Sequence, residues 1–181
     1  MLIEFSFALM LSGDLKHGEE LAHHAAALAV REDDLRAYLE VYGRAAYAYR
    51  LRDDLDGVLR FLTFAVNPAA PLHMPARTAY PVRTSIAELL RHRGDFAGAA
   101  AELERLLAML DAEPDLQSAR QSTRLFLALV YSDAERHSDA LPLLRAAHAS
   151  AIQRRDDELL TEVRYILIYT LTQLGRVNEA V

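Results

Sequence analysis

Apolar residues follow a helical spacing along most of the chain. Between residues 96 and 107 they recur at i, i+3, i+4 and i+7, at Phe96, Ala99, Ala100, Leu103, Leu106 and Leu107. This spacing gathers them on one face of an α-helix. The pair Gly94-Asp95 comes just before this segment and is typical of a tight turn. We therefore predict an amphipathic helix that begins directly after a turn.

The same pattern returns about every forty residues along the chain. One position on the buried face holds a compact residue in each copy: Val58, Ala99, Ala140 and Ala180, with Gly18 in a fainter first copy. The turn position reads Gly13, Asp53, Gly94, Glu135 and Gly175. The position that precedes the turn reads Tyr49, Leu90, Tyr131 and Leu171. Several independent positions that keep one period predict an internal repeat of helix A, tight turn, helix B and polar loop.

The repeat predicts a single domain over residues 1–181, with units at about 1–32, 33–73, 74–113, 114–155 and 156–181. Helix A of each unit is expected at about 1–12, 34–51, 76–92, 115–134 and 157–174. Helix B is expected at about 15–31, 54–66, 96–111, 138–153 and from 176 onward. Asp115, Asp156 and Asp157 are expected to cap helices. The four prolines between Asn67 and Pro81 predict a long connection and a delayed or kinked helix near Pro81.

The pattern resembles the tetratricopeptide repeat (TPR) family over nearly the whole chain. The resemblance is carried by Gly94-Asp95-Phe96 followed by Ala99, by Tyr131 with Ala140, and by Gly175 with Ala180. It implies an all-α fold, a right-handed α-α superhelix (a TPR-like solenoid) of about five antiparallel helix pairs. Each unit is about six residues longer than the usual ~34-residue repeat. The longer period and the acidic loops are similar to the sensor-arm repeats of large bacterial transcriptional regulators of the maltose-activator type.

Composition narrows the functional classes. Apolar residues make up 52% of the chain and charged residues 25%, as in a folded protein. The formal net charge of -6 argues against direct nucleic-acid binding. The absence of cysteine excludes disulfides, thiolate zinc sites and cysteine nucleophiles. The apolar opening segment carries Glu4 and is too short to span a bilayer, so we expect no membrane insertion and take the cytoplasm as the default compartment.

Motifs for catalysis are not found in the sequence. It has no glycine-rich phosphate loop, nucleophile elbow or HExxH motif, so we expect no enzyme activity, no cofactor and no metal. Glu20 and His23 have the ExxH spacing of some metal sites, but such sites need further carboxylates from facing helices. We therefore interpret His17, His23 and His24 as part of a solvated helix face. The Arg93-Gly94-Asp95 tripeptide is interpreted as a turn.

The candidate binding surface comes from the TPR resemblance, which places A helices along a concave face. Arg83, Arg124 and Arg164 share one position of consecutive A helices and could bind carboxylates or phosphates, which would suit an acidic partner. Alternatively they pair with acids of neighbouring helices, such as Glu88 or Glu162. The full set of candidate partner-binding residues is Tyr47, Arg50, Arg83, Glu88, Arg91, Arg124, Leu125, Leu129, Arg164, Tyr165 and Tyr169.

Two functions fit these observations. The first is a non-enzymatic scaffold that binds a protein or peptide along the concave face. The alternative is an effector-sensing arm of a bacterial transcriptional regulator, with a small ligand in the same groove. The chain begins with Leu2, Ile3, Phe5, Phe7 and Leu9 and stops early in a B helix. We therefore expect a fragment of a longer protein, and self-association into a homo-oligomer through an uncapped end.

Overall fold

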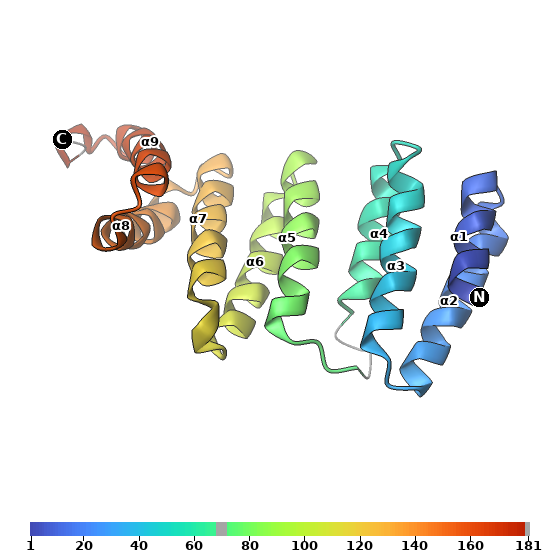
Figure 1. Cartoon of the computed structure of the whole chain (residues 1–181). Helices are drawn as coiled ribbons and strands as arrows, with labels where there is room; N and C mark the ends of the chain where they lie inside the picture. Colours follow the sequence, from blue (N-terminus) through green and yellow to red (C-terminus); the bar gives the residue numbers. More distant parts are fainter. Residues whose placement is uncertain (68–71, 180–181) are drawn as a thin grey trace. The chain divides into compact units, whose positions relative to one another are not determined.

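The computed structural model describes residues 1–67 and 72–179, and these residues form helices and contain no β-strand (Figure 1). The α-helices are α1 Leu2–Ser12, α2 Leu15–Arg31, α3 Leu35–Arg50, α4 Leu55–Ala65, α5 Ala76–His92, α6 Phe96–Asp111, α7 Gln117–Asp133, α8 His137–Arg154 and α9 Asp157–Gln173. Two short 3-10 helices are η1 Pro114–Leu116 and η2 Val177–Glu179. The chain divides into two compact units, Met1–Ile86 and Ala87–Val181, with the division inside α5.

The predicted all-α fold of paired helices is confirmed. The helices begin at Leu35, Ala76, Gln117 and Asp157, each close to its predicted start and within the usual uncertainty of a helix boundary. Of the fifth B helix, the structure describes only the 3-10 turn Val177–Glu179, and Ala180 lies outside the described residues. The division into one domain of five units stays a prediction.

The expectation of a delayed helix near Pro81 is wrong, whereas a kink there stays a prediction. Helix α5 begins at Ala76 and continues through Pro81 to His92. Pro81 is exposed, and its missing N–H removes only the one intrahelical bond to the Arg77 carbonyl. The helix tolerates the proline there because every following residue can still donate. Pro68 and Pro71 of the same predicted connection lie outside the described residues.

The predicted turn positions share one unusual backbone conformation. All five have positive φ angles: Gly13 101°, Asp53 55°, Gly94 77°, Glu135 59° and Gly175 70°. Glycine adopts this left-handed conformation without a steric cost, whereas a side chain at the same φ is strained. The repeated turn is therefore one backbone geometry, which Asp53 and Glu135 adopt although they carry a Cβ.

Aspartates begin five of the helices. Each accepts a hydrogen bond at its carboxylate from the backbone N–H three residues later, and they are Asp14, Asp34, Asp54, Asp95 and Asp156. Such a cap satisfies one of the N–H groups that a helix start leaves without a partner. The predicted cap at Asp156 is confirmed. Asp115 instead lies within η1, and Asp157 is the first residue of α9.

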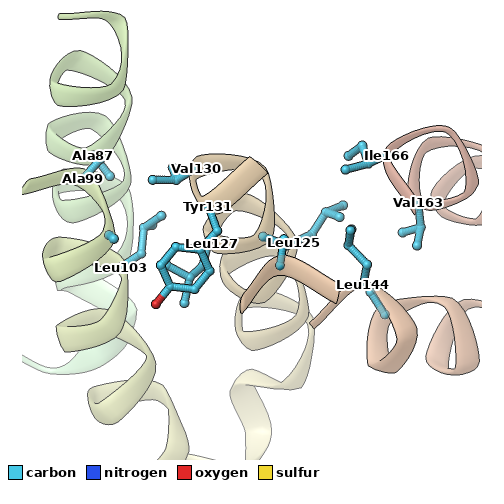
Figure 2. Packing of buried hydrophobic residues seen from close by; sticks show 14 residues of the cluster. Ala87, Ala99, Leu103, Leu125, Leu127, Val130, Tyr131, Leu144, Val163 and Ile166 are labelled. Carbon is cyan, nitrogen blue, oxygen red and sulfur yellow. The ribbon is translucent and has the colours of Figure 1, made fainter. Parts of the chain in front are cut away.

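The residues at the repeated compact position lie in the core. Ala99 and Ala140, at the repeated compact position, are fully buried, and Val58 at the same position is also buried. In the second unit, Leu103, Val130 and other side chains of α6 and α7 pack against each other beside Ala99 (Figure 2). Farther along the same core, Leu125, Leu144, Val163 and Ile166 converge from α7, α8 and α9 (Figure 2). The α7 helix therefore has one side buried towards α6 and another towards α8 and α9.

A tyrosine–carboxylate–arginine cluster joins three helices of the first unit. The Tyr49 hydroxyl on α3 donates to the Glu19 carboxylate on α2, and Arg60 Nη2 on α4 lies 2.5 Å from Glu19 Oε1. The Arg60 guanidinium lies 5.4 Å from the centroid of the Tyr49 ring. Burial, together with the bond to Glu19, raises the pKa of Tyr49 to about 12, because both favour the protonated phenol. Both the ring and the hydroxyl of Tyr49 are thus held in place.

A similar cluster recurs in the second unit. The Tyr131 hydroxyl on α7 donates to Glu104 Oε1 on α6 over 2.6 Å. The Arg136 guanidinium lies 4.4 Å from the centroid of the Tyr131 ring. Burial and the bond to Glu104 raise the pKa of Tyr131 to about 12. Tyr49 and Tyr131 occupy the same repeat position, which holds leucine at Leu90 and Leu171, so the polar cluster recurs two units along the chain.

Within the described ranges, none of the helices combines the length and the apolar character that a membrane crossing needs.

Candidate partner-binding site

The predicted site residues of the first unit divide between surface and interior. Tyr47 on α3 is 44% exposed, and the Arg50 guanidinium lies 5.1 Å from the centroid of its ring. Arg83 on α5 is only 9% exposed, and its Nη2 donates to the backbone carbonyl of Val66 over 3.2 Å. Val66 is the C-cap residue directly after α4. The Arg83 guanidinium therefore stabilises the end of a helix, and it is not accessible to a partner.

Two predicted arginines of the second unit form ion pairs with neighbouring helices. Arg91 Nε lies 2.5 Å from Asp133 Oδ2, and Arg124 Nη2 lies 3.7 Å from Asp111 Oδ1. The pairing of Arg124 with an acid of a neighbouring helix is of the kind expected as the alternative, although the acid is Asp111 and not Glu88 or Glu162. Both pairs are partly exposed, so each contributes about 0–1 kcal/mol to stability.

The remaining predicted residues of the second unit lie on different sides of their helices. Glu88 and Arg164 are exposed. Tyr165 and Tyr169 on α9 are also exposed, at 78% and 49%. Leu125 and Leu129 on α7 are buried and half-buried, respectively. The structure thus brings Leu125 and Leu129 together in one place and leaves the exposed side chains apart from it.

Leu125 and Leu129 line a pocket of about 440 Å³ between α7 and α9. Its α7 wall consists of Ser118, Gln121, Ser122, Leu125, Phe126 and Leu129. The opposite wall comes from the end of α8 and the first half of α9, with Arg154, Asp156, Glu158, Leu159, Glu162 and Ile166. The pocket lies wholly within the second unit. All of its lining residues except Leu125 and Leu129 are therefore new relative to the predicted set.

A sequence signal for the missed residues exists in the helix periodicity. Ser118, Ser122, Leu125 and Leu129 follow one another at intervals of three or four, and so do Glu158, Glu162 and Ile166 on α9. Each series marks one face of a helix. The sequence analysis placed the site on Arg124 and Arg164 instead. Adjacent residues of a helix point about 100° apart, so these arginines lie on a different face from Leu125 and Tyr165. Arg124 therefore faces Asp111 while Leu125 beside it faces the pocket.

The pocket combines an apolar interior with an acidic rim. Leu125, Phe126, Leu129, Leu159 and Ile166 supply the apolar lining. The charged lining residues are three carboxylates and one guanidinium: Asp156, Glu158, Glu162 and Arg154. An apolar lining with a few polar groups at defined positions is the usual composition of a ligand pocket.

The rim carboxylates have different surroundings. Asp156 accepts the Leu159 N–H over 3.1 Å as the cap of α9, and its Oδ2 lies 3.9 Å from Arg154 Nη2. Glu158 and Glu162 are exposed, and neither forms an ion pair with any residue that the structure describes. The amide of Gln121 on the facing wall has its Oε1 buried without a hydrogen-bond donor among the described residues. The rim therefore retains hydrogen-bonding capacity that the protein itself does not use.

The histidines and acids of α2 make local contacts. His17 Nδ1 lies 2.9 Å from the Asp14 carboxylate, and His23 Nδ1 lies 3.3 Å from the Tyr42 hydroxyl. Over the described ranges, no group of three or more histidine, aspartate or glutamate side chains is placed to hold a metal ion.

Exposed apolar side chains also lie on α1. Leu2 and Phe5 are exposed and, with Met1, Glu4 and Ala8, border a shallow hollow of about 660 Å³. Leu2 and Phe5 belong to the apolar segment for which an uncapped end is expected. Self-association through it stays a prediction.

Comparison with known proteins adds to the fold assignment. No protein-family model and no curated protein matches the chain. A solved putative kinesin light chain with nearly identical TPR-like repeats, from Podosopora anserina, has a TM-score of 0.66 at 17% identity, with 99% of this chain and 88% of that chain covered. BtubC (BKLC) from P. vanneervenii has a TM-score of 0.69 at 17% identity, with 97% of this chain and 72% of that chain covered.

A third similar structure is a Signal Transduction ATPase with Numerous Domains (STAND) protein with a tetratricopeptide repeat sensor, from Pyrococcus horikoshii. Its TM-score is 0.60 at 13% identity, and the match covers 99% of this chain and 28% of that one. At these identities the likeness concerns the fold, which is that of TPR-like helical repeats. The likeness to maltose-activator-type regulators stays a prediction.

Proposed function

We propose that the chain is a non-enzymatic interaction module and that the α7–α9 pocket receives a segment of a protein partner. The TPR-like repeat fold supports a protein-interaction scaffold. The observation that carries the proposal is the pocket itself, because Phe126, Leu129 and Leu159 of its apolar lining are only partly buried, above the core residues Leu125 and Ile166. Apolar surface kept accessible in this way is typical of a binding site.

The shape of the pocket suits a polypeptide. Helix α7 forms one wall, and polar side chains follow this wall at Ser118, Gln121 and Ser122. These groups can donate to and accept from a peptide backbone while apolar side chains of the peptide enter between α7 and α9. A central apolar contact surrounded by polar groups is the general arrangement of protein interfaces.

An effector-sensing arm is the second candidate. The pocket has a volume of about 440 Å³. Small-molecule sites typically measure roughly 300–1000 Å³, so this volume suits a small ligand as well. One of the matched structures is described as carrying a tetratricopeptide repeat sensor. A small ligand would use the same walls, so the two candidates differ in the size of the occupant and share the site.

The test fills the pocket without disturbing the core. Ser122 is exposed and lines the pocket, so Ser122→Trp places an indole in it. Ser138 on α8 is also exposed and lies outside the pocket, which makes Ser138→Trp the matched control. Peptides selected from a displayed random library against the full chain should bind at least ~10-fold more weakly to Ser122→Trp, a loss of about 1.4 kcal/mol. Their affinity for Ser138→Trp should be unchanged.

Two outcomes would contradict the proposal. Selection of no peptide, or of peptides that bind both variants equally, would remove the pocket as a protein-binding site. Thermal stabilisation by a member of a small-molecule library, lost in Ser122→Trp, would instead support the effector-sensing alternative.

A further inference from the structure

We propose that the partner segment presents an arginine or lysine to Glu158 and Glu162, next to an apolar side chain that enters the pocket. This inference depends on the proposed function, because it specifies the chemistry of the partner at the same site. The occupant is thus a basic, amphipathic polypeptide segment.

The two glutamates are placed to act together. They lie one helical turn apart on α9, and both line the pocket. Carboxylates at i and i+4 of a helix are neighbours and repel each other. A cation between them would relieve this repulsion, and a guanidinium can bind a carboxylate through two parallel hydrogen bonds.

Several other carboxylates of the helices pair with arginines of the chain. Asp111 lies 3.0 Å from Arg120, and Arg44 pairs with Glu4 and Glu40, in each case over 2.8 Å. In the pocket, the lining includes one cation, Arg154, whose Nη2 lies 3.9 Å from Asp156. Glu158 and Glu162 form no ion pair within the described part of the chain, so both carboxylates can pair with an arginine or lysine of the partner.

The apolar lining specifies what must accompany that cation. Leu159 and Ile166 lie on α9 beside the glutamates, and Leu125, Phe126 and Leu129 face them from α7. The methylene groups of an arginine or lysine can lie along such surface while the charged end reaches a carboxylate. An adjacent leucine-like side chain would fill the interior of the pocket.

Glu158 and Glu162 disfavour an acidic partner segment. The acidic-partner prediction rested on Arg83, Arg124 and Arg164, yet Arg83 is buried and Arg124 pairs with Asp111. An acidic side chain at the pocket would meet Glu158 and Glu162. Charge complementarity therefore favours the basic partner.

The experiment compares peptides that differ at one position. Synthetic octapeptides carry a fixed leucine and, beside it, arginine, lysine, glutamine or glutamate, and fluorescence anisotropy measures their affinity for the full chain. We expect the arginine and lysine peptides to bind at least ~10-fold more tightly than the glutamate peptide, with the difference decreasing as salt is raised.

Variants of the two glutamates assign the preference to the rim. In E158Q/E162Q the charge preference should be lost while the glutamine peptide binds as before, and in E158K/E162K the preference should reverse. Glu135→Gln is the control, because Glu135 is exposed and lies outside the pocket. Circular dichroism confirms that each variant is folded.

The outcomes separate this inference from the proposed function. Peptide binding that Ser122→Trp blocks but that shows no charge preference, or an acidic preference, would overturn the inference alone. A basic preference that persists in E158Q/E162Q would also overturn it. Binding that Ser122→Trp does not affect, or no binding of any peptide, would overturn both.

Discussion

A glycine in the first unit offers a direct test of helix packing. Gly57 lies in the first turn of α4, against the ring of Tyr49 on α3. A Cβ added at position 57 would lie 2.7 Å from Tyr49 Cε1 and closer still to Cγ and Cδ1. Carbon atoms in favourable contact are about 3.5–4.0 Å apart. Gly57→Ala therefore forces the Tyr49 ring or the helix to shift.

The ring is not free to move out of the way. Its hydroxyl donates to Glu19, the Arg60 guanidinium lies over it, and it stacks on Phe61 at a centroid distance of 5.5 Å. Overpacking at a site of this kind costs about 1–3 kcal/mol. Alanine also gains up to about 1 kcal/mol over glycine through its helix propensity, which partly offsets the clash.

A matched variant removes that second contribution. Gly43 on α3 is exposed, and a Cβ added there meets no atom within 4 Å. Gly43→Ala should therefore show the propensity gain alone, about 0.5–1 kcal/mol. The difference between the two variants isolates the clash, so Gly57→Ala should be less stable than Gly43→Ala by about 1–3 kcal/mol. Urea unfolding followed by circular dichroism measures both, and equal stability of the two variants would refute the described packing of α3 and α4.

Two further predictions concern the turns and the tyrosines. Glu135 has a φ of 59°. Glu135→Gly should therefore raise the free energy of unfolding by about 0.5–1 kcal/mol, and a lower melting temperature would contradict this. Tyr49 and Tyr131 have folded pKa values of about 12. The pKa of an unfolded tyrosine is roughly 10, so the folded state holds these protons more tightly. Their contribution to stability should be intact below about pH 10 and lost as the pH rises towards about 12, and urea midpoints that do not fall in that window would contradict it.

The helices and turns could be predicted because their signals are local. Asp156 caps the helix that follows it directly, and Gly94 adopts the turn conformation that its own backbone permits. The compact position at Ala99 is visible as part of a helical face in a single segment. In each case the residues that determine the structure are near neighbours in sequence.

The pocket could not be predicted in the same way. It depends on which faces of α7 and α9 oppose each other, and this is fixed by packing between residues some forty positions apart. The burial of Arg83 could not be predicted either, because an arginine is usually exposed. The buried guanidinium donates to the Val66 carbonyl, which lies 17 residues earlier in the chain. Arg124 and Leu125 are adjacent in sequence, yet only Leu125 lines the pocket.

The cluster around Glu19 has a consequence for how the first unit opens. In repeat proteins, stability is a sum of intrinsic terms for each repeat and coupling terms between nearest neighbours, as in a one-dimensional Ising chain. Glu19 belongs to the first helix pair, and Tyr49 and Arg60 belong to the second. Their contacts add to the coupling term between the pairs. Fraying of either pair therefore disrupts contacts of the other, so α2, α3 and α4 should exchange their amide hydrogens through one shared cooperative opening.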